Sequence, residues 1–155
     1  MTIRVEPFRD DLACHFEKLN LEWIERHFRV EERDREVLGN PRREVVDRGG
    51  EVFFLVDGDE VLGTCALIPH GEGVYELSKM AVDPASRGRG LGDRLMVAAI
   101  DWARGRGARK VFLESNTVLV PALELYRKHG FRTTRQGPGD EYARSNIEMT
   151  LDLPA

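Results

Sequence analysis

The sequence predicts an α+β fold with a mixed, mostly antiparallel central sheet. Two observations carry this prediction. The apolar segments 51–56, 61–68 and 74–82 follow one another through short turns, as the strands of an antiparallel meander do. The third segment leads through a glycine-rich loop into a helical pattern and then into a further apolar run at 111–113, which predicts a parallel βαβ unit in the middle of the chain.

The first fifty residues predict one short strand and two helices. Alternating residues indicate the strand at 3–7. A helix follows, because residues suited to one buried face recur at helical spacing, namely Leu12, His15, Phe16, Leu19 and Trp23. The charged segment 30–38 predicts a second, shorter helix, which ends before Pro41 because proline cannot continue a helix. Residues 41–46 can form one more turn.

The central meander and the helix after it have clear turn and end signals. Asp57-Gly58-Asp59-Glu60 predicts a hairpin turn between the first two strands. Gly105 and Gly107 mark the end of the helix that follows the glycine-rich loop. One face of this helix is apolar at helical spacing, with Leu91, Leu95, Ala98, Ala99 and Trp102.

The last third of the chain predicts one helix, one loop and one strand. Pro121 suits the first turn of the helix, and Gly130 suits the left-handed position at its end. Residues 136–140 predict a loop because glycine and proline gather there. Residues 146–151 alternate between polar and apolar side chains, as a strand does.

Composition narrows the class of protein. The 155 residues match one domain, and 41% hydrophobic with 32% charged residues excludes a disordered chain. No apolar run is long enough to cross a membrane and residues 1–7 lack a signal-peptide core, so we expect a cytoplasmic protein. The net charge of −4 argues against nucleic acid as a partner. Cys14 and Cys65 lack CxxC spacing, which favours free thiols, although Cys65 can also be read as a nucleophile.

The glycine-rich loop predicts a site for a pyrophosphate. Gly88, Gly90 and Gly92 let the backbone approach a ligand closely, and the helix that follows offers unpaired N–H groups to an anion. Arg87 and Arg89 add positive charge. The loop has no Gly-Lys-Ser/Thr sequence and no GxGxxG spacing, so it fits neither a P-loop nor a dinucleotide fold.

The order Arg87-x-x-Gly90-x-Gly92 after an apolar strand resembles the acyl-coenzyme A loop of the GCN5-related N-acetyltransferase (GNAT) family. Residues 121–131 resemble the family's second signature, a helix with a tyrosine shortly before Gly-Phe. With Asp83-Pro84 and Asn116, the resemblance covers residues 51–131 in detail.

The resemblance implies a three-layer α/β/α arrangement in a single domain over residues 1–155. Its parts are a strand and acceptor-side helices at 1–50, an acyl-coenzyme A-binding core at 51–135, and a loop and strand at 136–155. It also implies direct transfer of an acetyl group from acetyl-coenzyme A to a primary amine, with no metal. Two rival functions stay open, a non-catalytic acyl-coenzyme A sensor and a nucleotide-binding domain that uses the same loop.

Tyr126 corresponds to the family tyrosine that protonates the departing thiolate. Its phenol is protonated at neutral pH and can donate to a developing sulfur anion. The alternative is a tyrosine of the core with its hydroxyl at the surface.

For the base, the leading candidate is Glu76, because a carboxylate is rarely found in an otherwise apolar strand without a specific role. Strict alternation places Glu76 on one face with Ser78, Met80 and Val82. The alternatives are an edge-facing or salt-bridged Glu76, a base at Glu114 on the next strand, or an aspartate or histidine from the first helices.

The resemblance also implies the cofactor contacts. Pantetheine is expected to run beside the backbone of Met80, Ala81 and Val82 as an added strand. Asn116 is expected to contact the pantetheine arm, or else to cap a turn. The loop and the start of its helix complete the predicted set, with Arg87, Gly88, Arg89, Gly90, Leu91, Gly92 and Asp93.

The acceptor site is the part that the sequence defines least. Trp23, His27 and Phe28 lie in the region where the resemblance puts the acceptor, and the alternative is that they belong to the core. The overall acidic charge favours a small amine, an amino acid or a peptide amino terminus, with neither nucleic acid nor a membrane as partner. Many similar enzymes pair, so a homodimer is one expectation.

Overall fold

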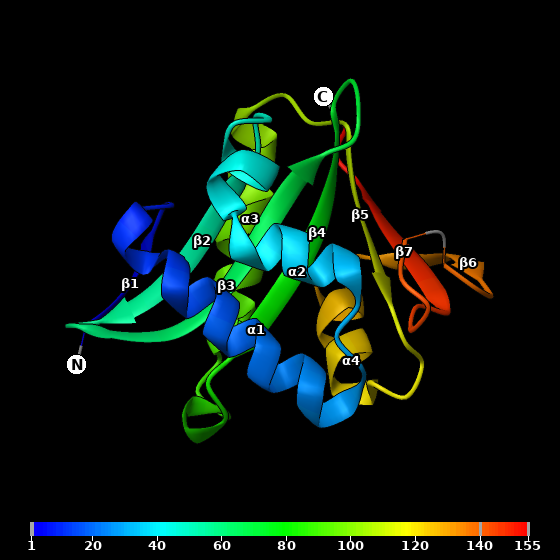
Figure 1. Cartoon of the computed structure of the whole chain (residues 1–155). Coiled ribbons are helices and arrows are strands. Elements are labelled where there is room, and N and C mark those ends of the chain that lie inside the picture. Colours follow the sequence, from blue (N-terminus) through cyan, green and yellow to red (C-terminus); the bar gives the residue numbers. More distant parts are fainter. Residues whose placement is uncertain (1, 140, 155) are drawn as a thin grey trace.

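The computed structural model describes residues 2–139 and 141–154. Within them, seven strands form one sheet in the order β1-β2-β3-β4-β5-β7-β6 (Figure 1). Neighbouring strands are antiparallel except β4 and β5, which are parallel, as predicted for the βαβ unit. The strands are β1 (Ile3–Glu6), β2 (Glu51–Asp57), β3 (Glu60–Pro69), β4 (Val74–Val82), β5 (Lys110–Ser115), β6 (Arg132–Gln136) and β7 (Ile147–Asp152).

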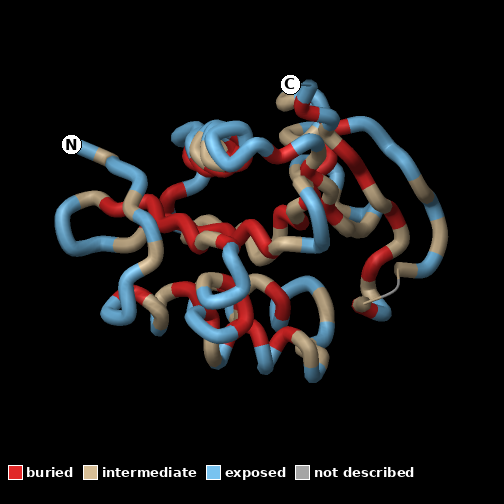
Figure 2. The backbone as a smooth tube through the Cα atoms, turned by 90° about the horizontal axis from the view of Figure 1, so that it is seen from above, coloured by how far each residue is buried: buried red, intermediate tan, exposed pale blue. Residues whose placement is uncertain are grey.

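Helices cover both faces of the sheet. On one face, α1 (Ala13–His27) and α2 (Glu32–Gly39) pack over a core that includes Phe16, Val37 and Phe54. On the other face, α3 (Leu91–Gly105) and α4 (Val120–Lys128) pack over a core that includes Leu55 and Leu95. Figure 2 shows the buried sheet as a band between two helical layers whose outer sides are exposed. The predicted three-layer α+β fold is confirmed.

Short helical turns complete the described chain: Asp10–Leu12, Arg42–Val46 and Pro84–Ser86. The turn at Arg42–Val46 is π-helical and lies within the segment where one more turn was predicted. Among the described residues, no helix combines the length and the apolar character needed to cross a membrane.

The sequence pattern did not reveal β6. Its residues, Arg-Thr-Thr-Arg-Gln, are mostly exposed and show no apolar alternation, because β6 is the edge strand and rests on β7 alone. The predicted loop at 136–140 therefore begins one residue later, since Gln136 ends β6. Asp140, the last residue of that predicted loop, lies outside the described residues.

The buried side of α1 differs by one position from the predicted face. Phe16, Asn20 and Ile24 are the buried residues of the helix, whereas Leu19 and Trp23 are only half-buried. Asn20 is tolerated in the core because its side-chain amide donates to the carbonyl of Phe16 at 2.9 Å. This rotation leaves Trp23 at the edge of the buried face.

A bulge at Lys79 interrupts β4. Lys79 has φ of 56°, in the left-handed region, and the pairing of β3 with β4 shifts register between Thr64 and Ala66. Met80 and Val82 therefore pack against the α3 side of the sheet, while Glu76 pairs opposite Ile68 in the core under α1. The prediction that Glu76 shares a face with Met80 and Val82 was wrong, because alternation does not continue through a bulge.

The strands β4 and β5 separate soon after they meet. Their parallel pairing covers Val74–Glu76 and Lys110–Phe112 only, after which β5 continues alongside β7 (Figure 1). Beyond Glu76, the backbone of β4 that faces β5 is therefore left without a neighbouring strand among the described residues. This separation opens the sheet at its centre.

Candidate active site

A cavity of about 660 Å³ occupies the space where β4 and β5 separate. Its walls come from both helical layers as well as from the two strands. The lining includes residues 76–82 of β4, residues 113–115 of β5, the second half of α1, and the start and middle of α4. Because the sheet is open here, one cavity reaches both faces of the molecule.

The glycine-rich loop reaches this cavity through Arg87 and Gly92, which are part of its lining. Gly88 and Gly90 have φ of 80° and 71°, a conformation that only glycine adopts readily. Gly90 is also the residue that precedes the first turn of α3. The exposed N–H groups of that turn are suited to a diphosphate, as the sequence predicts.

The other loop residues differ in what they can offer to a ligand. Leu91 is buried in the core, so its backbone is the part that can contact a cofactor. A methyl group on Gly92 would approach the side chain of Leu125 to 3.0 Å, so glycine allows α3 and α4 to pack closely. Asp93 contacts His129 at 2.8 Å and Lys128 at 2.9 Å, so its carboxylate joins α3 to α4. Arg89 is exposed.

The middle of the cavity offers a free strand edge. Met80, Ala81 and Val82 all line the cavity, past the point where β5 leaves β4. Backbone groups along this edge can accept an extended pantetheine arm in place of a strand. The geometry thus suits the predicted contact.

Asn116 lies on the cavity wall, but its side chain is already bonded. It donates to the carbonyl of Arg144 at 2.7 Å and accepts from the N–H of Val118 at 2.9 Å. In this structure Asn116 therefore caps a turn, which is the alternative role that the sequence left open. A pantetheine arm that contacts its side chain has to compete with these two hydrogen bonds.

Tyr126 lines the same cavity from α4 and packs near Phe131, with ring centroids 6.2 Å apart. Burial, with the neighbouring Cys65 as a second cause, raises the pKa of Tyr126 to about 12. The phenol therefore keeps its proton at neutral pH. Burial also raises the pKa of the Cys65 thiol, which makes this cysteine a poor nucleophile.

Glu76 is 4% exposed and lines the cavity on the α1 side. One of its oxygens lies 2.8 Å from Nε2 of His70, whose ring meets Phe112 edge-on at 5.0 Å. Hydrogen bonding to Glu76 raises the pKa of His70, against the effect of partial burial. Glu114, the other predicted candidate for the base, also lines the cavity and lies 3.8 Å from Arg135.

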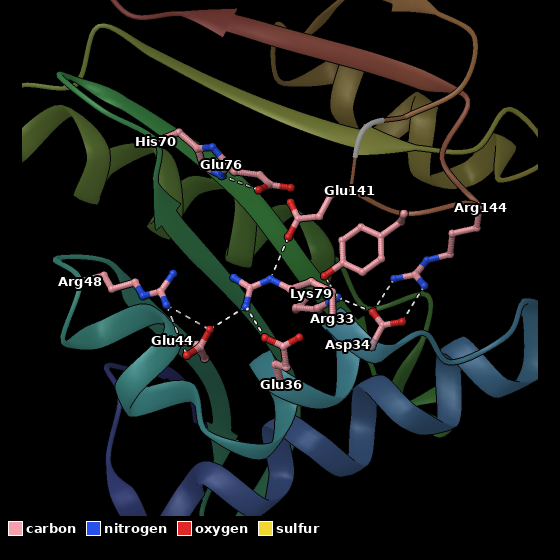
Figure 3. Close-up of polar contacts among 11 residues, drawn as sticks. Arg33, Asp34, Glu36, Glu44, Arg48, His70, Glu76, Lys79, Glu141 and Arg144 are labelled. Carbon is pink, nitrogen blue, oxygen red and sulfur yellow. Dashed lines mark hydrogen bonds and ion pairs between the residues drawn. The ribbon is translucent and has the colours of Figure 1, made fainter.

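A buried ion network stands beside these residues, and the sequence pattern did not reveal it (Figure 3). Asp34, a fully buried residue of α2, accepts a hydrogen bond from Lys79 at 2.6 Å and two hydrogen bonds from Arg144 at 2.6 and 2.7 Å. Lys79 also donates to the hydroxyl of Tyr142 at 2.9 Å. The available signal was Lys79 itself, since a lysine inside an apolar strand needs a buried partner.

The predicted acceptor residues form one aromatic group at the end of α1. The ring centroid of Trp23 lies 5.2 Å from that of His27 and 5.9 Å from that of Phe28. All three line the cavity, with His27 exposed and the other two half-buried. They are therefore wall residues on the α1 side of the cavity.

One group among the described residues has the composition of a metal site. The side chains of His70, Glu76 and Glu141 bring potential ligand atoms within 4.8 Å of one another. Glu141 already accepts a bond from Arg33 at 3.0 Å, and Glu76 is bonded to His70. The prediction that no metal takes part remains a prediction.

Comparison with known proteins identifies relatives over most of the chain. The model of the acetyltransferase (GNAT) family matches residues 10–131. A mycothiol acetyltransferase of Corynebacterium glutamicum (strain R) is 37% identical over 84 residues, which are 54% of this chain and 29% of the relative. The chain thus matches less than a third of that relative's length.

Solved structures show the same fold at low sequence identity. A GNAT acetyltransferase from Staphylococcus aureus Mu50 has a TM-score of 0.90 at 19% identity, and covers 99% of this chain and 100% of its own. A Bacillus subtilis acetyltransferase in complex with CoA has a TM-score of 0.74 at 22% identity, with 99% and 100% covered.

Proposed function

The chain belongs to the GNAT acetyltransferase family, and from this membership we propose that it transfers the acetyl group of acetyl-coenzyme A directly to a primary amine. The observation that carries the proposal is the single cavity that the glycine loop, Tyr126 and Glu76 share. The acceptor is a small molecule, an amino acid or a peptide amino terminus. The two substrates approach from opposite faces of the sheet.

In the cofactor half of the site, backbone groups and one arginine bind acetyl-coenzyme A. The first turn of α3 and Arg87 hold the diphosphate, and the free edge at residues 80–82 holds the pantetheine arm. This binding places the thioester near the bulge of β4 and within reach of α4. Asn116, which follows β5 on the other side of the opening, contacts the pantetheine arm.

Glu76 acts as the base in this proposal. Its carboxylate takes a proton from the acceptor ammonium, directly or through a water molecule, and the free amine attacks the thioester carbon. A C–N bond forms and the C–S bond breaks. Tyr126 donates its phenol proton to the sulfur as negative charge develops there. The second proton that the nitrogen loses as the amide forms returns through solvent to the phenolate, so no acyl-enzyme is needed.

The aromatic group of Trp23, His27 and Phe28 forms the acceptor wall in this proposal. The rings offer an apolar and π-rich surface beside the reacting amine. The boundaries of the single domain over residues 1–155, the cytoplasmic location and the homodimer remain predictions that belong to this proposal.

The first experiment is a thermal-shift titration with acetyl-coenzyme A, coenzyme A, longer acyl-coenzyme A species, ATP and NAD. Stabilisation by the coenzyme A compounds alone is expected, because a ligand that binds the folded state raises the melting temperature. A larger effect of ATP or NAD would contradict the proposal.

The second step is an amine panel in which released coenzyme A is measured by thiol titration, with and without a chelator. Turnover that the chelator does not change is expected. Binding of acetyl-coenzyme A without turnover on any amine would instead favour the non-catalytic sensor.

A further inference from the structure

Glu76 connects the cavity to a residue outside it. Its carboxylate forms part of the cavity wall, but the side chain is only 5% exposed. Among the described residues, its hydrogen-bond partner is His70, at 2.8 Å from Oε1. The second oxygen, Oε2, is thus left to interact with a substrate. The behaviour of this carboxylate as a base depends on what His70 donates to it.

His70 is held in a defined position at the surface. It follows β3 in the turn before β4, where its N–H donates to the carbonyl of Val74 at 2.9 Å. Phe112 meets the ring edge-on, with the two planes at 80°. The side chain is 38% exposed and is not part of the cavity wall. His70 can therefore exchange protons with solvent while it stays bonded to Glu76.

The surroundings of His70 are acidic. Glu76 from β4 and Glu141 from the loop before β7 both favour the protonated ring (Figure 3), and so does Glu114 from β5. Lys79, which acts on Glu76 from further along β4, is paired with Asp34. The charge that changes nearest to Glu76 in the neutral pH range is therefore that of His70.

We propose that His70 positions Glu76 and switches its basicity with pH. A neutral His70 donates its Nε2–H to Oε1, which orients the carboxylate and leaves Oε2 to take the proton of the acceptor ammonium. A protonated His70 places a full positive charge against the same carboxylate and weakens it as a base. This inference rests on the proposed function, in which Glu76 is the base.

The direction of the effect follows from electrostatics. An adjacent positive charge lowers a carboxyl pKa by about one to three units, and a weaker base accepts the proton more slowly. Wild-type kcat/KM should therefore fall as the pH drops through the pKa of His70. His70 acts through Glu76 and does not touch the substrate, so it is a positioning residue.

The test compares His70→Gln with the wild-type protein over a range of pH. Glutamine can place an N–H donor where Nε2 lies but cannot become charged. At a pH well above the pKa of His70, where the ring is neutral, the two proteins should have similar kcat/KM. At a pH well below that pKa, the variant should exceed the wild type by roughly 3- to 30-fold. A structural role alone predicts no such crossover.

Two further variants complete the design. His70→Leu removes the donor as well as the charge, and its kcat should lie roughly tenfold below that of His70→Gln at every pH, so that glutamine restores the activity that leucine loses. His15→Gln makes the same exchange on α1 away from the cavity wall, and it should follow the wild-type profile. The midpoint of the wild-type profile should equal the pKa of His70 measured by NMR.

The outcomes separate the inference from the function on which it rests. Parallel pH profiles for wild type and His70→Gln would overturn the role of His70 and leave acetyl transfer in place. A wild-type protein that acetylates no amine would overturn both. A profile midpoint that differs from the NMR pKa of His70 would also overturn the switch.

Discussion

The carboxylate of Asp93 lies 2.8 Å from Nε2 of His129, which joins the first turn of α3 to the end of α4. Lys128 contacts the same carboxylate at 2.9 Å. On the inner side of this contact, the bare Cα of Gly92 lets Leu125 pack against α3. The helix that follows the glycine loop and the helix that carries Tyr126 thus form one wall of the cavity.

Replacing Tyr126 with phenylalanine tests the proposed acid. We expect kcat to fall by roughly tenfold to a thousandfold, because proton donation to the sulfur is lost. Affinity for coenzyme A, measured by calorimetry, should stay near the wild-type value. Because the pKa of Tyr126 is raised to about 12, this group should cause no loss of wild-type kcat up to about pH 10.

Tyr75 provides the matched control for this substitution. It packs against Trp102 at 5.5 Å and lies outside the cavity wall, so Tyr75→Phe should keep the wild-type kcat. Full turnover in Tyr126→Phe would remove Tyr126 from the mechanism.

Replacing Arg87 with alanine tests the diphosphate site. A charge-assisted hydrogen bond contributes about 1.5–3 kcal/mol, so the KM for acetyl-coenzyme A should rise by about 10- to 100-fold. The KM for the amine should not change. Arg104→Ala is the control, because that side chain lies at the other end of α3 and is 61% exposed. Equal effects of the two substitutions would argue against a specific contact at Arg87.

Replacing Trp23 with alanine tests the acceptor wall. Loss of the ring should raise the KM for a hydrophobic amine by about tenfold, from the loss of buried apolar contact, and should leave the KM for acetyl-coenzyme A unchanged. Val97→Ala, on the exposed side of α3, removes an apolar side chain away from the cavity. If instead Trp23→Ala lowers the melting temperature and changes neither KM, the residue belongs to the core.

The buried network around Asp34 predicts a loss of stability in acid. Burial alone would raise the pKa of Asp34, but hydrogen bonds from Arg144 and the charge of Lys79 lower it to about 2. A folded-state pKa below the ordinary value of about 3.8 means that the ionised group stabilises the fold above about pH 4. This contribution, on the order of 2 kcal/mol, should be lost as the pH falls from about 4 to about 2.

Urea unfolding as a function of pH, in wild type and Asp34→Asn, measures this contribution. The variant should be about 3–5 kcal/mol less stable at neutral pH, because two buried cations lose their partner. It should also lose less stability between about pH 4 and pH 2. Asp59→Asn, in the exposed turn between β2 and β3, should match the wild type. An unchanged acid dependence in Asp34→Asn would contradict the assigned pKa.

The features that the sequence predicted well depend on neighbouring residues. The glycine loop is one example, because the left-handed conformations of Gly88 and Gly90 are a local backbone requirement. The β2–β3–β4 meander is another, since its turns and apolar runs lie close together in the chain. Family signatures then connected Tyr126 to the same cavity.

The features that the sequence did not reveal depend on distant partners or on irregular backbone. Asp34 and Arg144 are 110 positions apart, and no spacing rule relates them. The bulge at Lys79 reverses the alternation of β4, so face assignments beyond it were wrong. His70 and Glu76 are six positions apart, but the turn between β3 and β4 decides that they meet.

The opening between β4 and β5 separates the residues proposed to bind the cofactor from the residues proposed to bind the amine. In the proposed function, cofactor recognition depends on α3, α4 and their loop, while the amine meets α1 on the opposite face of the sheet. Substitutions on the fifteen residues of α1 can therefore change which amine is accepted and leave the cofactor wall unaltered. Such a layout makes the acceptor range of the fold easy to diversify, by evolution or by directed mutagenesis of one helix.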